Sequence, residues 1–210
     1  MRFQRAYHFL VKGFGKTGSR FSPGPEISTG GTKPASFAPK LWRFCGNPHV
    51  KETALIEPMH ATIRREAAEH PGVLPTAHDW STLSFGGHDS KSDRAALTHA
   101  HDVGYDLATA LLMVRGFDGA PIAPAVVSLK AAAVVHSTRD DPHPLDMCHV
   151  DQVLGNIKYT YAMKFGSTVV HVIDREADSV NHWRQWSADG HLALVRADDR
   201  VVLYQGEEQS

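Results

Sequence analysis

The fold class follows from the stretch TVVHVIDREADSVNHWRQWSADGHLALV, residues 168–195. Its first six residues form an almost continuous apolar run, which predicts a strand buried on both faces. The run stops at Asp174. Beyond it, Val180, Trp183 and Trp186 recur three positions apart, which predicts one apolar helix face and favours the core for both tryptophans over a role as base-stacking platforms. A short strand, HLALV, follows this helix, so the order is strand, helix, strand.

Three further strands are predicted ahead of this stretch, at residues 76–85, 103–114 and 121–130. Asp118-Gly119 lies between the last two, and Asp-Gly between apolar runs is a strong hairpin signal. Helical spacing then predicts a helix over residues 144–165, with Pro144 in its first turn. Near the end of the chain, HLALV and RVVLY are expected to pair as two short strands. Together these elements indicate an α/β fold with a mixed sheet and helical cover.

Composition and charge narrow the function classes. The 210 residues are 42% hydrophobic with a net charge of −1, which excludes a chain that is disordered throughout. No run of about 18 apolar residues occurs, which excludes a membrane-spanning helix. The charge is uneven, because residues 1–43 sum to +7 and the remainder to −8. A basic arm on an acidic body is typical of a tail that meets nucleic acid, and a solvated tail without a partner is the alternative.

Two aspartates are candidates for chemistry. Asp79 lies in a β-like segment, and Asp174 ends an apolar strand, where open α/β sheets bind their ligands. Carboxylate oxygens at such positions suit Mg²⁺ or Mn²⁺, and two such ions can activate water and stabilise the leaving oxygen of a phosphodiester. The alternative is structural, with Asp174 capping the next helix and Asp79 in a surface turn.

Three stretches, in this order along the chain, resemble one protein family. They are LWRFCGNPHVKETALIEPM (41–59), AHDWSTLSFGGHDSKSDRAALTHAHDVGYDLATALLM (77–113) and TVVHVIDREADSVNHWRQWSADGHLALVRADDRVV (168–202). They resemble the DDE transposases of bacterial insertion sequences, in particular the class with a β-stranded insertion in a ribonuclease H-like core. The DREAD signature after an apolar strand, at 174–178, is specific to that group.

The resemblance implies a ribonuclease H-like mixed sheet with helices, and it implies a site. Asp79 matches the first catalytic aspartate and Asp174 the second, and in the family both bind divalent metal for DNA strand cleavage and transfer. The basic segment before Leu41 lies where relatives bind transposon ends. The implied partners are transposon-end DNA and a second transposase chain, either a copy of this one or an intact transposase. The implied location is the bacterial cytoplasm, at the nucleoid.

The chain departs from the family's pattern near its C-terminus. The family's third ligand is a glutamate in a Tyr-x-x-Arg-x-x-x-Glu helix after the inserted β region, and nothing here fits. Tyr204 is the only tyrosine after Asp174, and Glu207 and Glu208 have neither the spacing nor a helical context. The sheet is therefore expected to be incomplete at the C-terminus, and the chain is expected to bind metal weakly and to be inactive alone.

Four segments follow from the composition and the resemblance. Residues 1–40 are expected to form a basic, flexible arm, since Gly, Pro, Ser and Thr dominate positions 15–40. Residues 41–75 are a helical segment, residues 76–190 the partial catalytic core, and residues 191–210 the start of the inserted β region. Within the helical segment, the spacing predicts a buried face made of Leu55, Met59, Ile63 and Ala67.

Three functions remain open from the sequence. The first is a transposase-like protein of DNA transposition whose metal-dependent cleavage is lost with the third ligand. The second is a DNA-binding or partner-binding regulator that inhibits an intact transposase, which the basic arm favours. The third is a decayed relic that folds poorly. The candidate contacts to DNA phosphates, with solvated surface charge as the alternative, are Lys91, Arg94, Arg196 and Arg200.

The histidines suggest a weaker alternative, a structural zinc site. The candidates are His99 and His101, and the cluster His143, Cys148 and His149, but no second pair at a zinc-site spacing accompanies them. Cys148 falls on the predicted helix, where a buried free cysteine is inert packing rather than a nucleophile.

Overall fold

The structure is a computed structural model, and the chain divides into two units, Met1–Lys51 and Glu52–Ser210. It describes residues 5, 7–9, 12, 37–97, 99, 101–114, 119–199, 202–204 and 207–209. In the first unit, helix α2 spans Phe37–Cys45 and has Arg43 in its last turn, where a cation is favourable. Residues 37–40, expected to lie in the flexible arm, are therefore helical. The remainder of the Gly/Pro-rich stretch lies outside the described residues.

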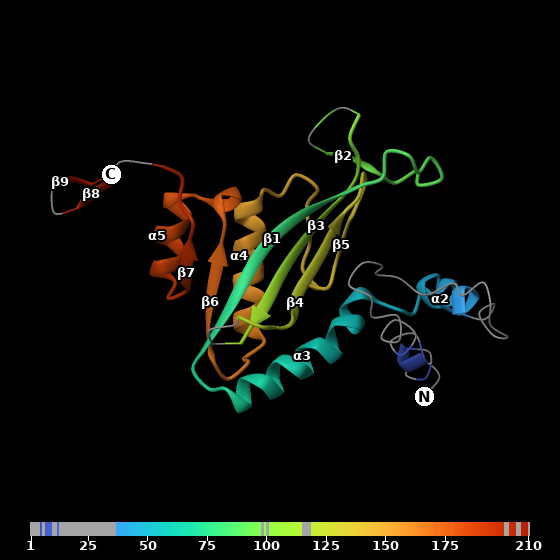
Figure 1. Ribbon diagram of the computed structural model, residues 1–210, viewed down its shortest axis with the longest axis horizontal. Coiled ribbons are helices and arrows are strands. Elements are labelled where there is room, and N and C mark those ends of the chain that lie inside the picture. Colours follow the sequence, from blue (N-terminus) through green and yellow to red (C-terminus); the bar gives the residue numbers. More distant parts are fainter. Residues whose placement is uncertain are drawn as a thin grey trace. The chain divides into compact units, whose positions relative to one another are not determined.

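A seven-stranded mixed sheet forms the basis of the second unit (Figure 1). Its strands are β1 (Val73–Ser84), β2 (Ala95–Ala96), β3 (Val103–Met113), β4 (Pro121–Lys130), β5 (Val135–Ser137), β6 (Thr168–Ile173) and β7 (Leu192–Val195). Their order across the sheet is β5-β4-β3-β1-β6-β7, with β2 paired to β3. The pairs β1–β3 and β3–β4 are antiparallel, which confirms the three predicted antiparallel strands. Residues 115–118, in the turn of the predicted hairpin, lie outside the described residues.

The strands β6 and β7 extend the sheet in parallel on the other side of β1. Helix α5 (Val180–Ala188) connects them, and a helical crossover returns the chain in the same direction. The expected pairing of HLALV with RVVLY is therefore wrong. Instead β7 pairs with β6, while β8 (Val202–Tyr204) pairs with β9 (Glu207–Gln209) in a separate sheet. Residues 192–195, assigned from the sequence to the last segment, thus belong to the main sheet.

Two longer helices precede α5, and α4 differs in detail from the sequence prediction. Helix α4 spans His149–Ala162 with Cys148 as its N-cap, so Pro144 precedes the helix rather than lying in its first turn. Helix α3 spans Glu52–Glu69 and contains Pro58. Among the described residues, no helix combines the length and the apolar character that crossing a bilayer requires.

The buried face of α3 is rotated relative to the predicted one. It consists of Ile56, His60, Ile63 and Ala67, so only the last two predicted members are buried. The reason is His60, whose Nε2 lies 2.9 Å from the carbonyl oxygen of Ala125 and whose ring packs near Tyr159 and Phe165. Met59, predicted to be buried, is exposed instead.

All three of these helices contribute to cores on one face of the sheet. Ile63 of α3 packs in one cluster with Leu74 of β1, and Trp186 of α5 packs in another with Ile157 of α4 and Ile173 of β6. Ile173 of β6 pairs with His78 of β1, and His78 lies four residues beyond Leu74 on the same strand. Side chains an even number of residues apart on a strand lie on one face, so both clusters lie on the same face of the sheet. The predicted core role of the tryptophans is confirmed, with Trp186 fully buried.

The face of the sheet opposite these helices is less covered, so the prediction that β6 is buried on both faces is wrong. Its residues Val170 and Val172 are only half-buried. Next to them on β7, Leu192 and Leu194 are 49% and 64% exposed. The reason is that the helices of the described core clusters all lie on the other face.

Candidate functional site

Asp79 and Asp174 lie side by side at the meeting of two parallel strands. The register pairs Ala77 with Val172 and His78 with Ile173, and the next residues along are the two aspartates. The backbone of Asp174 remains extended, with φ −84° and ψ 176°. Neighbouring strands are about 4.8 Å apart, so the two carboxylates leave the sheet at adjacent positions. By alternation, both side chains lie on the face opposite the helices.

Each carboxylate accepts hydrogen bonds and remains exposed. The hydroxyl of Ser81 donates to Oδ2 of Asp79 at 2.9 Å. The backbone N–H of Arg175 donates to Oδ1 of Asp174 at 2.8 Å, which caps the short 3₁₀ turn η2 (Arg175–Ala177). The structural alternative is thus partly right for Asp174, which does cap the next turn. It is wrong for Asp79, which lies inside β1 rather than in a turn.

Arg196 completes a row of three side chains across β1, β6 and β7. It follows Val195, which pairs with Ile173, and its backbone N–H donates to the carbonyl of Ile173 at 2.8 Å. Its guanidinium lies 3.4 Å from Oδ1 of Asp174. Both side chains are more than half exposed, and such exposed pairs contribute little to stability. A metal ion or a phosphate can therefore replace this contact at small cost.

The aspartate pair offers oxygen ligands of the kind that Mg²⁺ and Mn²⁺ prefer. Among the described residues, the one group of three ligands close enough to hold an ion is Glu66, Glu69 and His70, at the end of α3. No third ligand of the described part therefore joins Asp79 and Asp174. Sequence reasoning missed the α3 group, although spacings of three and four residues on a helix place side chains together.

The predicted phosphate contacts have different surroundings. Arg196 lies at the aspartate pair, whereas Arg94 donates from Nη1 to the carbonyl of Phe85 at 2.8 Å. The ammonium of Lys91 lies 5.1 Å from the ring centroid of Phe85. Arg94 and Lys91 therefore brace the segment after β1. Arg200 lies outside the described residues.

The residues of the zinc alternative do not converge. Cys148 is exposed, which corrects the expectation of a buried thiol. His99 and His101 are not part of any three-ligand group among the described residues. The other candidates have separate partners: His143 contacts Arg139, Cys148 donates to Asp151, and His149 stacks on Trp80 with ring centroids 4.4 Å apart.

A buried histidine pair, missed from the sequence, lies on the other face beside the aspartates. Nε2 of His78 and Nδ1 of His171 are 2.9 Å apart. Burial lowers the pKa of His78 to about 4. Burial, together with the charges of His78 and His191, lowers the pKa of His171 to about 3, so both rings are neutral at pH 7. The available signal was a histidine inside each apolar strand, just ahead of Asp79 and Asp174.

No protein-family model matches the chain, and a search of the curated proteins finds no match.

Proposed function

We propose that the chain is a transposase-like, DNA-binding protein with a ribonuclease H-like core, in which Asp79 and Asp174 hold divalent metal against DNA phosphates. The observation that supports this proposal is the register of β1 and β6, which makes the two aspartates neighbours. The mixed sheet is compatible with such a core. The DREAD sequence directly after β6 fits the same family.

Each residue of the row has a role that its chemistry allows. Asp79 and Asp174 bind Mg²⁺ or Mn²⁺ through carboxylate oxygens, and the hydrogen bond from Ser81 orients Asp79. The ion, when bound, supplies polarisation of a phosphoryl oxygen and activation of water. Arg196 leaves Asp174 and binds a phosphate, because guanidinium and phosphate make charge-assisted, bidentate hydrogen bonds. The pair supplies only two ligands, so metal binding is weak and the chain alone does not cleave DNA.

DNA binding should strengthen with Mn²⁺ and weaken steeply with salt. In fluorescence anisotropy with a labelled duplex, we expect several-fold tighter binding when Mn²⁺ is added, because the ion bridges carboxylates and phosphates. The logarithm of affinity should fall with the logarithm of salt by about 0.9 for each phosphate neutralised. Asp79→Asn and Asp174→Asn should each remove the gain from Mn²⁺ and leave metal-free binding in place.

Asp189→Asn is the matched control, since this aspartate ends α5 and is exposed. It should retain the full gain from Mn²⁺. Negligible binding even at low salt would contradict a DNA function of any kind. If the DNA affinity depends on salt but is unchanged by Mn²⁺ and by either asparagine substitution, the metal site is contradicted.

The chain alone should leave DNA intact. We expect no conversion of supercoiled plasmid carrying transposon-like ends to the nicked form with Mg²⁺ or Mn²⁺, because the described aspartate pair lacks a third ligand. Agarose gels of overnight incubations measure this. Nicking that Asp79→Ala abolishes would show that two aspartates suffice and would sink this prediction.

A second candidate function is a regulator that binds DNA or an intact transposase. The observation that favours it is the exposed apolar surface of Leu192 and Leu194 on β7. This strand is the last in the order of the sheet. An unpaired, uncharged edge strand is a template for another chain. A copy of this chain or an intact transposase would cover it in a mixed assembly. DNA binding that is indifferent to Mn²⁺ is the outcome that supports this candidate over the first.

A further inference from the structure

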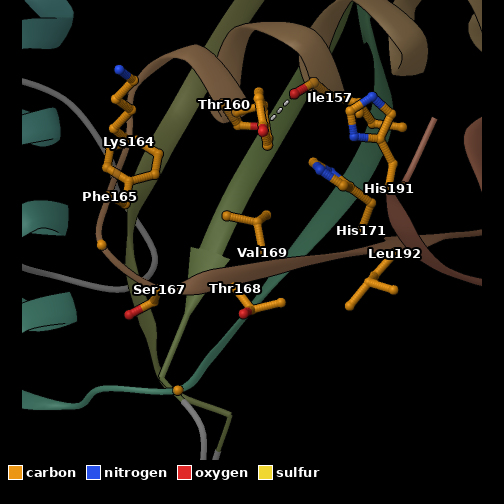
Figure 2. Close-up of a pocket in the computed structure, with 14 residues that line it drawn as sticks. Ile157, Thr160, Lys164, Phe165, Ser167, Thr168, Val169, His171, His191 and Leu192 are labelled. Atoms are coloured by element: carbon orange, nitrogen blue, oxygen red, sulfur yellow. Dashed lines mark hydrogen bonds between the residues drawn. The ribbon is translucent and has the colours of Figure 1, made fainter.

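A cavity of about 740 Å³ lies at the end of β6 away from Asp174 (Figure 2). Its walls are the last turns of α4, the turn from Lys164 to Ser167, the first half of β6, and residues 190–192 at the start of β7. Small-molecule sites occupy about 300–1,000 Å³, so this cavity admits water and small ligands. Neither aspartate of the pair lines it.

Two imidazoles line this cavity. His171 reaches it from β6 and is 3% exposed. Its Nδ1 is engaged by His78, and its Nε2 has no hydrogen-bond partner among the described residues. His191 enters from the loop ahead of β7, and its ring meets that of Tyr161 edge-on, with centroids 5.8 Å apart. The charge of His191 acts on the pKa of His171, so the two rings lie within electrostatic reach of each other.

The chemistry of the lining selects a class of ligand. None of the described residues that line the cavity is Asp, Glu or Cys, and the nitrogen ligands of the kind that metals prefer are the imidazoles of His171 and His191. Imidazole suits Zn²⁺, Cu²⁺ and Ni²⁺, whereas Mg²⁺ and Mn²⁺ prefer carboxylate oxygens. The contact from His78 to the far nitrogen of His171 is the outer-shell arrangement that orients a ligating histidine.

We propose that His171, through Nε2, and His191 bind a transition-metal ion of the Zn²⁺ class in this cavity. The two histidines supply two positions of a tetrahedral ion, and water or a small ligand admitted by the cavity fills the rest. The site is chemically distinct from the aspartate pair, which binds harder ions at the other end of the strand. Its failure would therefore leave the proposed function untouched.

The test uses Cu²⁺ as the probe, added to the purified full chain at one equivalent. We expect an electron paramagnetic resonance spectrum with hyperfine splitting from two nitrogens, and this signal should decrease when a large excess of Zn²⁺ competes for the site. In a proton–nitrogen correlation spectrum, Cu²⁺ should broaden the amides of Thr160, Val169 and His191 first. His191→Gln should weaken Cu²⁺ binding at least about tenfold, which corresponds to 1.4 kcal/mol.

Two controls separate this site from others. His182→Gln removes a histidine whose Nδ1 is already bonded to Ser179 and which does not line the cavity, so it should change neither affinity nor spectrum. Asp79→Asn should also change neither. Broadening centred elsewhere in the spectrum, or Cu²⁺ binding unchanged in His191→Gln, overturns the proposal. The broadening map uses the unaltered chain, so it tests the proposal even if a variant of the buried His171 does not fold.

Discussion

Gly155→Ala is expected to lower the free energy of unfolding by about 2 kcal/mol, the cost typical of overpacking. The direction is opposite to the usual one, because alanine in a helix interior is normally about 1 kcal/mol better than glycine. Gly155 lies in α4, and the guanidinium of Arg139 lies against it. A Cβ at position 155 would lie 2.6 Å from Nη2 of Arg139 and closer still to Nη1.

Arg139 cannot move away without breaking other contacts. Its side chain is fully buried, and it donates from Nε and Nη2 to the two carboxylate oxygens of Asp141, at 2.7 and 2.8 Å. Its Nη1 donates to Oδ1 of the buried Asn156 at 2.7 Å. Moving the guanidinium would leave Asn156 unsatisfied, at about 1–3 kcal/mol for a buried polar group. The alanine methyl must therefore distort the helix or break this network.

Urea denaturation of Gly155→Ala, Arg139→Met and the double variant measures the effect, with midpoints compared at constant m-value. In the Arg139→Met background, the same alanine should be neutral or stabilising, since the guanidinium is gone. A higher midpoint for Gly155→Ala in the unaltered chain would contradict the packing described for α4. A broad, non-cooperative transition of the unaltered chain would instead support the decayed relic.

The second large effect is a loss of stability in mild acid, caused by His78 and His171. The folded pKa values of about 4 and about 3 lie below the ordinary value of 6.5, because burial opposes protonation. The unfolded chain therefore binds protons at pH values where these two rings of the folded chain do not. Stability is complete above pH 6.5 and falls as the pH drops toward 4, by about 1.4 kcal/mol per pH unit for each histidine.

Urea midpoints between pH 7 and pH 5, with EDTA present to remove metal, should show a loss of about 4 kcal/mol. In proton–carbon spectra, two histidine rings should remain neutral at pH 5. The variant His101→Gln, which removes an exposed ring, is the matched control and should retain the loss of stability. A flat profile, or a full set of rings titrating between pH 6 and 7, would contradict the buried pair.

Local patterns accounted for most of the elements but not for their contacts. The strand at 168–173 and the helix after it were visible as an apolar run and a helical spacing, and the predicted antiparallel strands formed as expected. The rotated face of α3 could not be foreseen, because it depends on His60 meeting a carbonyl 65 residues away. The partial exposure of one face of β6 could not be predicted either, because an apolar run does not show which face of the strand the helices cover.

For the candidate site as well, the residues could be predicted from the sequence but their contacts could not. The two aspartates were identified from their segments and from the family resemblance, but their adjacency depends on the pairing of strands more than 90 residues apart. The contact from Arg196 to Asp174 depends on β7 joining the main sheet rather than pairing with the next strand. The histidine pair required both strands to be in register, 93 residues apart in sequence.

The most direct test of the central claim is to titrate the chain with Mn²⁺ and follow paramagnetic broadening of backbone amides. The aspartate pair predicts broadening centred on Asp79, Asp174 and Arg196, lost in Asp174→Asn and retained in Asp189→Asn. Asp79 and Asp174 would then be shown to share one ion across the strands. Broadening confined to residues 66–70 at the end of α3, or spread evenly over the acidic surface, would contradict the account.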